Sequence, residues 1–157
     1  GVSFAKLGLA GSGSAGLASW HRIRERFERD FPEQVAWVAV IYVDWHGAGA
    51  PVPDEILQVA VREPRCAGVL VDTWSKSPRP TVDLGDGWRE RIELVHSSGQ
   101  FFAWAGGMGL AEIERLGRFK LTPDIIAVRG SACRDGDRLG LIDSNRVRAL
   151  RDAASRI

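Results

Sequence analysis

Apolar segments rich in β-branched and aromatic residues recur along the chain, and each is followed by a segment with the periodicity of an amphipathic helix. The apolar segments begin near Val2, Val35, Gly68, Phe101 and Ile125. Helices are expected over residues 16–31, 53–63, 87–99, 109–119 and 143–157. Strict alternation of strands and helices predicts parallel βαβ units with right-handed crossovers, and therefore an α/β fold.

Two architectures are built from such units: an open, doubly wound sheet and a (β/α)₈ TIM barrel. A complete barrel needs about 250 residues and eight units, whereas this chain has 157 residues and only five apolar segments. If the fold is a barrel, residues 1–157 form a single domain that supplies its C-terminal part. The chain is then expected to be a piece of a longer enzyme, with roughly three units preceding it.

Side chains alternate between the two faces of a strand, so each apolar segment can be divided into two rows. One row of each segment mixes apolar residues with a polar residue or a glycine near the carboxyl end. These rows are Phe4, Lys6 and Gly8; Val38, Val40, Tyr42 and Asp44; Gly68, Leu70 and Asp72; Phe102, Trp104 and Gly106; and Ile125, Ala127 and Arg129. The pattern predicts a site at the carboxyl ends of the strands, with apolar packing beneath helices on the other face.

The polar residues of these rows suit carbonyl chemistry. Lys6, Asp72 and Lys76 would place two amines and a carboxylate around one opening. An amine beside another cation in a site of low polarity has a lowered pKa, so it can act as a base or form an imine, and a carboxylate can shuttle protons. Other interpretations remain: Lys6 can extend out of the sheet, and Asp44 or Asp72 can cap a following helix instead of facing substrate.

Glycine-rich turns after the last two strands are candidates for binding phosphate. Backbone N–H groups can approach anionic oxygens where glycine permits it, and phosphate sites in barrels follow strands seven and eight. The candidate residues for binding the substrate or its phosphate are Asp44, Gly106, Gly107, Arg129, Gly130 and Ser131. The glycines can equally serve tight turns, and Arg129 can bridge to one of the acids.

The amino-acid composition limits the classes of molecule that the protein is expected to bind. With 21 basic and 20 acidic residues the net charge is +1, so nothing favours nucleic acid or an anionic membrane. Apolar runs are too short to span a bilayer, and the three histidines form no cluster suited to a metal. Two widely spaced cysteines indicate reduced thiols and a cytoplasmic protein. A small phosphorylated molecule is the expected partner.

The segments "FAKLGLAG", "VAVIYVDW", "VLVDTWSK" and "VRGSACRDGDRLGLID", in this order, resemble the (5-formylfuran-3-yl)methyl phosphate synthase family, also called 4-(hydroxymethyl)-2-furancarboxaldehyde phosphate synthase. The resemblance covers essentially the whole chain. It implies a TIM-barrel lyase that condenses two molecules of glyceraldehyde 3-phosphate into a furan aldehyde phosphate for methanofuran biosynthesis. It also implies a homo-oligomer that needs no metal or organic cofactor.

By the same resemblance, Lys6 matches the proton-accepting lysine of the family, and Asp72 and Lys76 match its catalytic aspartate and second lysine. The Schiff-base lysine of the family belongs to an earlier strand than any in this chain. The chain departs from the family pattern in two places. It reads "KSPRP" from the second lysine onward, where the family usually has an acidic residue and a glycine after that lysine, and Gly107 replaces a serine. Two other functions remain open: a related class I aldolase or phosphosugar isomerase, and a non-catalytic half-barrel that binds a phosphorylated metabolite or a partner barrel.

Overall fold

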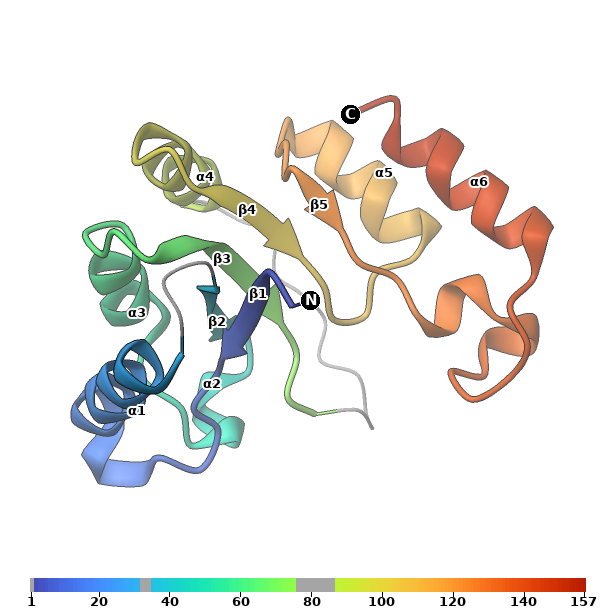
Figure 1. Cartoon of the computed structure of the whole chain (residues 1–157). Coiled ribbons are helices and arrows are strands. Elements are labelled where there is room, and N and C mark those ends of the chain that lie inside the picture. The colour runs from blue at the N-terminus through green and yellow to red at the C-terminus, as the bar shows by residue number, and fades with distance from the viewer. Residues whose placement is uncertain (1, 32–34, 76–86) are drawn as a thin grey trace.

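One parallel sheet forms the centre of the molecule in the computed structural model, which describes residues 2–31, 35–75 and 87–157 (Figure 1). In the described residues the strand order is β1-β2-β3-β4-β5, so strands adjacent in sequence are adjacent in the sheet. The strands are Phe4–Leu7 (β1), Ala36–Tyr42 (β2), Cys66–Asp72 (β3), Phe101–Trp104 (β4) and Ile125–Ile126 (β5). The predicted α/β class with parallel strands is confirmed.

The helices lie close to where periodicity predicts them. They are Gly16–Asp30 (α1), Pro53–Ala60 (α3), Trp88–Ser97 (α4), Leu110–Phe119 (α5) and Ser144–Ala154 (α6), with short turns at Trp45–Ala48 (α2), Gly13–Ala15 (η1), Gly130–Ala132 (η2) and Arg134–Gly136 (η3). Local signals fix their ends: Pro53 opens α3, and the Asp143 carboxylate accepts hydrogen bonds from the N–H groups of Asn145 and Arg146 to cap α6.

The main apolar core lies between one face of the sheet and the helices (Figure 1). Its largest buried side chains are tryptophans in pairs. Trp20 of α1 meets Trp37 of β2 edge to face, with ring centroids 5.2 Å apart, and Trp88 of α4 meets Trp104 of β4 at 4.8 Å. Each pair joins a helix to the strand beneath it, because burying large aromatic surface is strongly favourable.

The opposite face of the sheet carries a smaller cluster of Val38, Val40, Leu70 and Ala103. No described helix covers this inner face, and its apolar side chains become exposed toward the edges of the sheet: Phe4 on β1 is 52% exposed and Ile125 on β5 is 47% exposed. A doubly wound sheet has helices on both faces. In the described residues the helices pack against one face alone.

The predicted orientation of the fourth strand is wrong by one residue. Phe102 and Trp104 are fully buried on the helix side, whereas Phe101 and Ala103 lie on the inner face. Both rows of this strand are apolar, so polarity did not distinguish them. The bulkier row fills the space beneath the helices, and the smaller row suits the narrower inner face.

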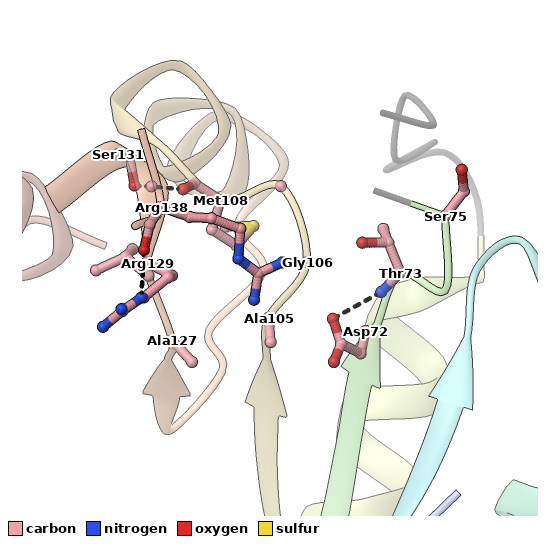
Figure 2. Close-up of a pocket in the computed structure, with 13 residues that line it drawn as sticks. Asp72, Thr73, Ser75, Ala105, Gly106, Met108, Ala127, Arg129, Ser131 and Arg138 are labelled. Atoms are coloured by element: carbon pink, nitrogen blue, oxygen red, sulfur yellow. Dashed lines mark hydrogen bonds between the residues drawn. The ribbon is translucent and has the colours of Figure 1, made fainter. Parts of the chain in front are cut away.

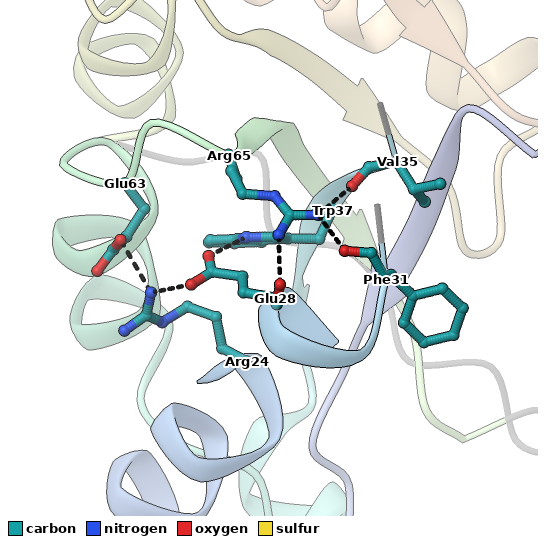
Figure 3. Close-up of polar contacts among 7 residues, drawn as sticks. All are labelled: Arg24, Glu28, Phe31, Val35, Trp37, Glu63 and Arg65. Carbon is teal, nitrogen blue, oxygen red and sulfur yellow. Dashed lines mark hydrogen bonds and ion pairs between the residues drawn. The ribbon is translucent and has the colours of Figure 1, made fainter. Parts of the chain in front are cut away.

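Arg65 joins several elements at the amino end of β3 (Figure 3). Its guanidinium donates to the carbonyl of Glu28 at 2.7 Å and to that of Val35 at 2.9 Å. Beside it, Arg24 pairs with Glu28 and Glu63. Arg65 therefore ties the end of α1 and the start of β2 to β3, at the end of the sheet opposite the candidate site.

None of the helices in the described part of the chain is long and apolar enough to cross a membrane.

Candidate active site

A cavity of about 220 Å³ opens at the carboxyl ends of β3, β4 and β5 (Figure 2). Its walls are the segments that follow these three strands. They contribute Asp72, Thr73, Ser75, Ala105, Gly106, Gly107, Met108, Ala127, Val128, Arg129, Gly130, Ser131 and Arg138. The structure thus brings together six of the residues singled out from the sequence: Asp72, Gly106, Gly107, Arg129, Gly130 and Ser131.

The turn after β4 requires glycine for two reasons. Gly106 and Gly107 both have φ near +70°, a left-handed conformation that other residues adopt only with strain. In addition, a Cβ at Gly106 would lie 2.5 Å from the backbone nitrogen of Thr73. Glycine here lets the β4 turn approach the end of β3 closely, and so sets the width of the cavity beside Asp72.

The two glycine turns are linked and carry unused donors. The Ser131 hydroxyl donates to the carbonyl of Met108 at 2.7 Å, which ties the β5 turn to the β4 turn. Within the described residues, no acceptor is hydrogen-bonded to the N–H groups of Gly106, Gly107, Gly130 or Ser131. Unpaired N–H groups on the wall of a polar cavity are suited to anionic oxygens.

The two acids have different surroundings. Asp72 is half-buried at the end of β3, and its Oδ1 accepts a hydrogen bond from the Thr73 N–H at 2.8 Å. Asp44 accepts hydrogen bonds from the N–H groups of Trp74 and Ser75, at 2.8 and 2.7 Å. Neither side chain caps a helix of the described residues: Asp44 precedes α2 without bonding its N–H groups, and Gly87 precedes α4. Asp44 instead holds the segment that follows Asp72.

Tyr42 lies between these acids and was not among the candidates from the sequence. Its ring meets Trp74 edge to face, and its hydroxyl oxygen is 2.7 Å from the position that a Cβ on Gly8 would occupy. Burial raises the pKa of Tyr42, and the carboxylates of Asp72 and Asp44 raise it further. The hydroxyl therefore stays protonated at neutral pH and can donate a hydrogen bond. The sequence did offer one signal for Tyr42: it lies near the carboxyl end of the row of Val38, Val40 and Asp44, which was expected to face the site.

Lys6 is not brought into this cavity. Lys6 is exposed on the inner face of β1, where it pairs in register with Val38, which in turn pairs with Gly68. Asp72 lies four positions beyond Gly68 on β3, so Lys6 is about 13 Å nearer the amino end of the sheet. Lys76, the other predicted catalytic lysine, lies outside the described residues.

Arg129 does not bridge to an acid. Its Nε donates to the carbonyl of Arg138 at 2.9 Å, and no ion pair joins it to any residue of the described ranges. Figure 2 shows its guanidinium pointing away from Asp72. Arg138, which the sequence did not single out, also lines the cavity.

The part of the chain that the structure describes contains neither a cluster of metal ligands nor an exposed cysteine. No group of three histidines, cysteines or acids is suited to a metal ion there. Cys66 and Cys133 are both unpaired and buried, and burial raises the pKa of the Cys66 thiol to about 11.

Fold and cavity together define a class: a parallel α/β protein whose polar cavity, bounded by an acid and two glycine turns, opens at the carboxyl edge of its sheet. The model of the 4-HFC-P synthase family matches residues 1–151, and the chain belongs to this family.

The relatives carry the corresponding name. The (5-formylfuran-3-yl)methyl phosphate synthase of Methanopyrus kandleri is 33% identical over 98% of this chain and 65% of its own length. The proteins of the same name from Methanococcus maripaludis and Methanocaldococcus jannaschii are 34% and 29% identical, over 78% and 96% of this chain and 52% and 70% of their own lengths. The chain thus spans between half and seven tenths of these relatives.

Proposed function

We propose that the full-length protein containing this chain is a (5-formylfuran-3-yl)methyl phosphate synthase. It condenses two molecules of glyceraldehyde 3-phosphate into a furan aldehyde phosphate, a step of methanofuran biosynthesis in the cytoplasm. Family membership and the names of the relatives support this activity. The structural observation that carries it is the cavity in which Asp72 faces two linked glycine turns, because a phosphorylated carbonyl substrate needs a proton-transfer group and an anion site in one opening.

In this proposal Asp72 transfers protons to and from the reacting carbons. Lys6 accepts a proton, and Lys76 supplies the second amine. The imine-forming lysine is supplied from outside these residues. Asp44 contributes to substrate binding indirectly. Its carboxylate accepts hydrogen bonds from the N–H groups of Trp74 and Ser75, and this keeps the segment after Asp72 in place beside the substrate.

The phosphate group of the substrate binds at the turns after β4 and β5. The N–H groups of Gly106, Gly107, Gly130 and Ser131 supply directional donors, and the loop that begins with Arg129 supplies positive charge. Because the Ser131 hydroxyl is already donating to Met108, its backbone N–H is the group available to phosphate.

We further propose that residues 1–157 form one domain, the C-terminal part of a (β/α)₈ barrel. Sequential strand order, helices along one face and an inner face that carries apolar side chains support a barrel over a doubly wound sheet. In a closed barrel, further strands pair with the outer edges of β1 and β5 and cover Phe4 and Ile125. Closure also changes the surroundings of Lys6, which the present sheet leaves exposed.

The test uses the full-length product of the gene that encodes this chain. Incubation with glyceraldehyde 3-phosphate should produce a conjugated furan aldehyde with near-ultraviolet absorbance, and borohydride should trap a substrate imine. Trapping without the chromophore indicates a class I aldolase or isomerase instead. Neither trapping nor turnover indicates a non-catalytic binding protein, and contradicts the synthase proposal.

A further inference from the structure

The cavity is entered by an arginine to which no role has been given. Figure 2 shows the side chain of Arg138 extending toward Gly106 and Ala105, across the cavity from Asp72, while the guanidinium of Arg129 points to the outside. Both side chains carry a guanidinium cation with five N–H donors. Both residues line the cavity, but only the guanidinium of Arg138 points into it.

The guanidinium of Arg138 has no partner among the described residues. It makes no hydrogen bond and no ion pair with them, although Asp72 lines the same cavity. An arginine that neutralised Asp72 would show such a contact. Here five N–H donors are left for something that enters the cavity.

The donors around Arg138 match an anion with several oxygens. The unpaired N–H groups of Gly106, Gly107, Gly130 and Ser131 line the same space. A guanidinium binds phosphate through two parallel hydrogen bonds, and backbone N–H groups can take the remaining oxygens. A carboxylate has two oxygens and would leave part of this set unused.

The position of Arg138 is fixed by its loop. Cys133 and Ile142 form an antiparallel bridge, and the Arg134 N–H donates to the carbonyl of Leu141, so the loop is closed at its base. Near its tip, the carbonyl of Arg138 accepts the hydrogen bond from Arg129 Nε at 2.9 Å. Arg129 thus holds the backbone from which the Arg138 side chain extends.

We propose that Arg138 is the cation that binds the phosphate of the substrate, and that Arg129 positions it through the Arg138 carbonyl. The identity of the substrate rests on the proposed function. The anion site itself does not, because it follows from the cavity, the free guanidinium and the unpaired N–H groups.

Binding of inorganic phosphate to the full-length protein, measured by calorimetry at low ionic strength, tests the site without requiring turnover. Arg138→Ala should raise the dissociation constant by about tenfold or more, since hydrogen bonds between charged groups contribute that much. Arg138→Lys should fall between, because lysine keeps the charge and loses the paired geometry. Arg134→Ala is the matched control: it removes the same charge from the same loop, outside the cavity, and should change the constant by about twofold or less.

The positioning role of Arg129 has its own measurement. If Arg129 acts through Arg138, Arg129→Ala weakens phosphate binding in the wild-type background and adds nothing in the Arg138→Ala background. Additive losses mean that Arg129 binds phosphate itself and overturn that part. An unchanged constant in Arg138→Ala, or a wild-type protein that binds no phosphate, overturns the proposal. Phosphate binding without furan product overturns the proposed function alone.

Discussion

Gly106 must be glycine for two reasons, its backbone conformation and the lack of space for a side chain. Gly106→Ala would place a Cβ at φ +70° and 2.5 Å from the Thr73 backbone nitrogen. A backbone atom cannot move aside cheaply, so the β4 turn must shift away from Asp72. We expect a loss of about 2 kcal/mol or more in the free energy of unfolding, and a higher KM for the phosphorylated substrate, measured by urea titration and by steady-state kinetics.

Gly99 provides the matched control for this substitution. Its φ is +77°, but a Cβ there would meet nothing within 4 Å. Gly99→Ala should therefore cost only the left-handed conformation, about 1 kcal/mol, and leave KM unchanged because Gly99 lies at the other end of β4. Equal losses for the two variants would mean that close approach to Thr73 does not shape the site.

Asp72 is the residue on which the proposed chemistry depends most directly. Asp72→Asn keeps an oxygen that can accept the Thr73 N–H and removes the ability to exchange a proton. Turnover should fall by about 10²–10⁴-fold with little change in stability. Asp124→Asn, which removes an exposed carboxylate paired with His96, should leave turnover unchanged. Wild-type turnover in the Asp72 variant would remove this residue from the mechanism.

The ion pair between Asp54 and Arg91 predicts a pH dependence of stability. Hydrogen bonding to Arg91 lowers the pKa of Asp54 below its ordinary value, outweighing the opposite effect of burial. When the pKa of a carboxyl group is lower in the folded state, the group stabilises the protein at every pH above its unfolded-state pKa. This stabilisation is lost as the pH falls through the folded-state pKa. Asp54→Asn should therefore be less stable than wild type at pH 7, by under about 1 kcal/mol, and the difference should vanish in acid. A difference that persists there would contradict this origin.

Sequence reasoning located most of the cavity but missed its arginine. Asp72, Gly106 and Gly130 could be found because strand ends and glycine turns are local signals. Arg129, Arg134 and Arg138 all lie in one charged segment. Which of them faces the cavity depends on the Cys133–Ile142 bridge and on the bond from Arg129 to the Arg138 carbonyl. Both are tertiary contacts that residue types do not reveal.

At the scale of elements, order and type could be predicted, whereas the orientation of β4 could not. Strands β2 and β3 carry a polar residue at their carboxyl ends, Asp44 just beyond β2 and Asp72 at the end of β3, which fixes their two faces. In β4 both rows are apolar, and packing against Trp88 decides that Trp104 turns toward the helices. Side-chain volume therefore determines which row of β4 faces the helices, and an alternation of polar and apolar residues carries no information about volume.

Arg65 supports the elements from the end opposite the cavity. Arg65→Ala would remove bonds to the carbonyls of Glu28 and Val35 and leave these acceptors without that partner. We expect a loss of about 2–3 kcal/mol in unfolding free energy, measured by chemical denaturation, with unchanged turnover in the protein that remains folded. Arg62→Ala, which loses only a long bond to Gln58, is the control and should change stability by about 0.5 kcal/mol or less. A mild Arg65 variant would mean that apolar packing alone holds α1 and β2 in register.

For the whole molecule, the central question is what covers the inner face of the sheet. Phe4 stacks edge to face on Phe101, with centroids 5.7 Å apart, yet remains 52% exposed. In an open sheet such a residue keeps its exposure. In a closed barrel it becomes an interior residue, in the layers of side chains that fill the centre.

A charge at Phe4 therefore distinguishes the two architectures in the full-length protein. In a barrel, Phe4→Asp buries a carboxylate and removes a core aromatic side chain, so the free energy of unfolding should fall by about 3 kcal/mol or more. Phe119→Asp, at a residue 47% exposed at the end of α5, should cost about 1 kcal/mol, in keeping with its partial burial. Denaturant titration of both variants decides the matter: a Phe4 loss no larger than that at Phe119 means that the inner face meets solvent, and the barrel proposal is then wrong.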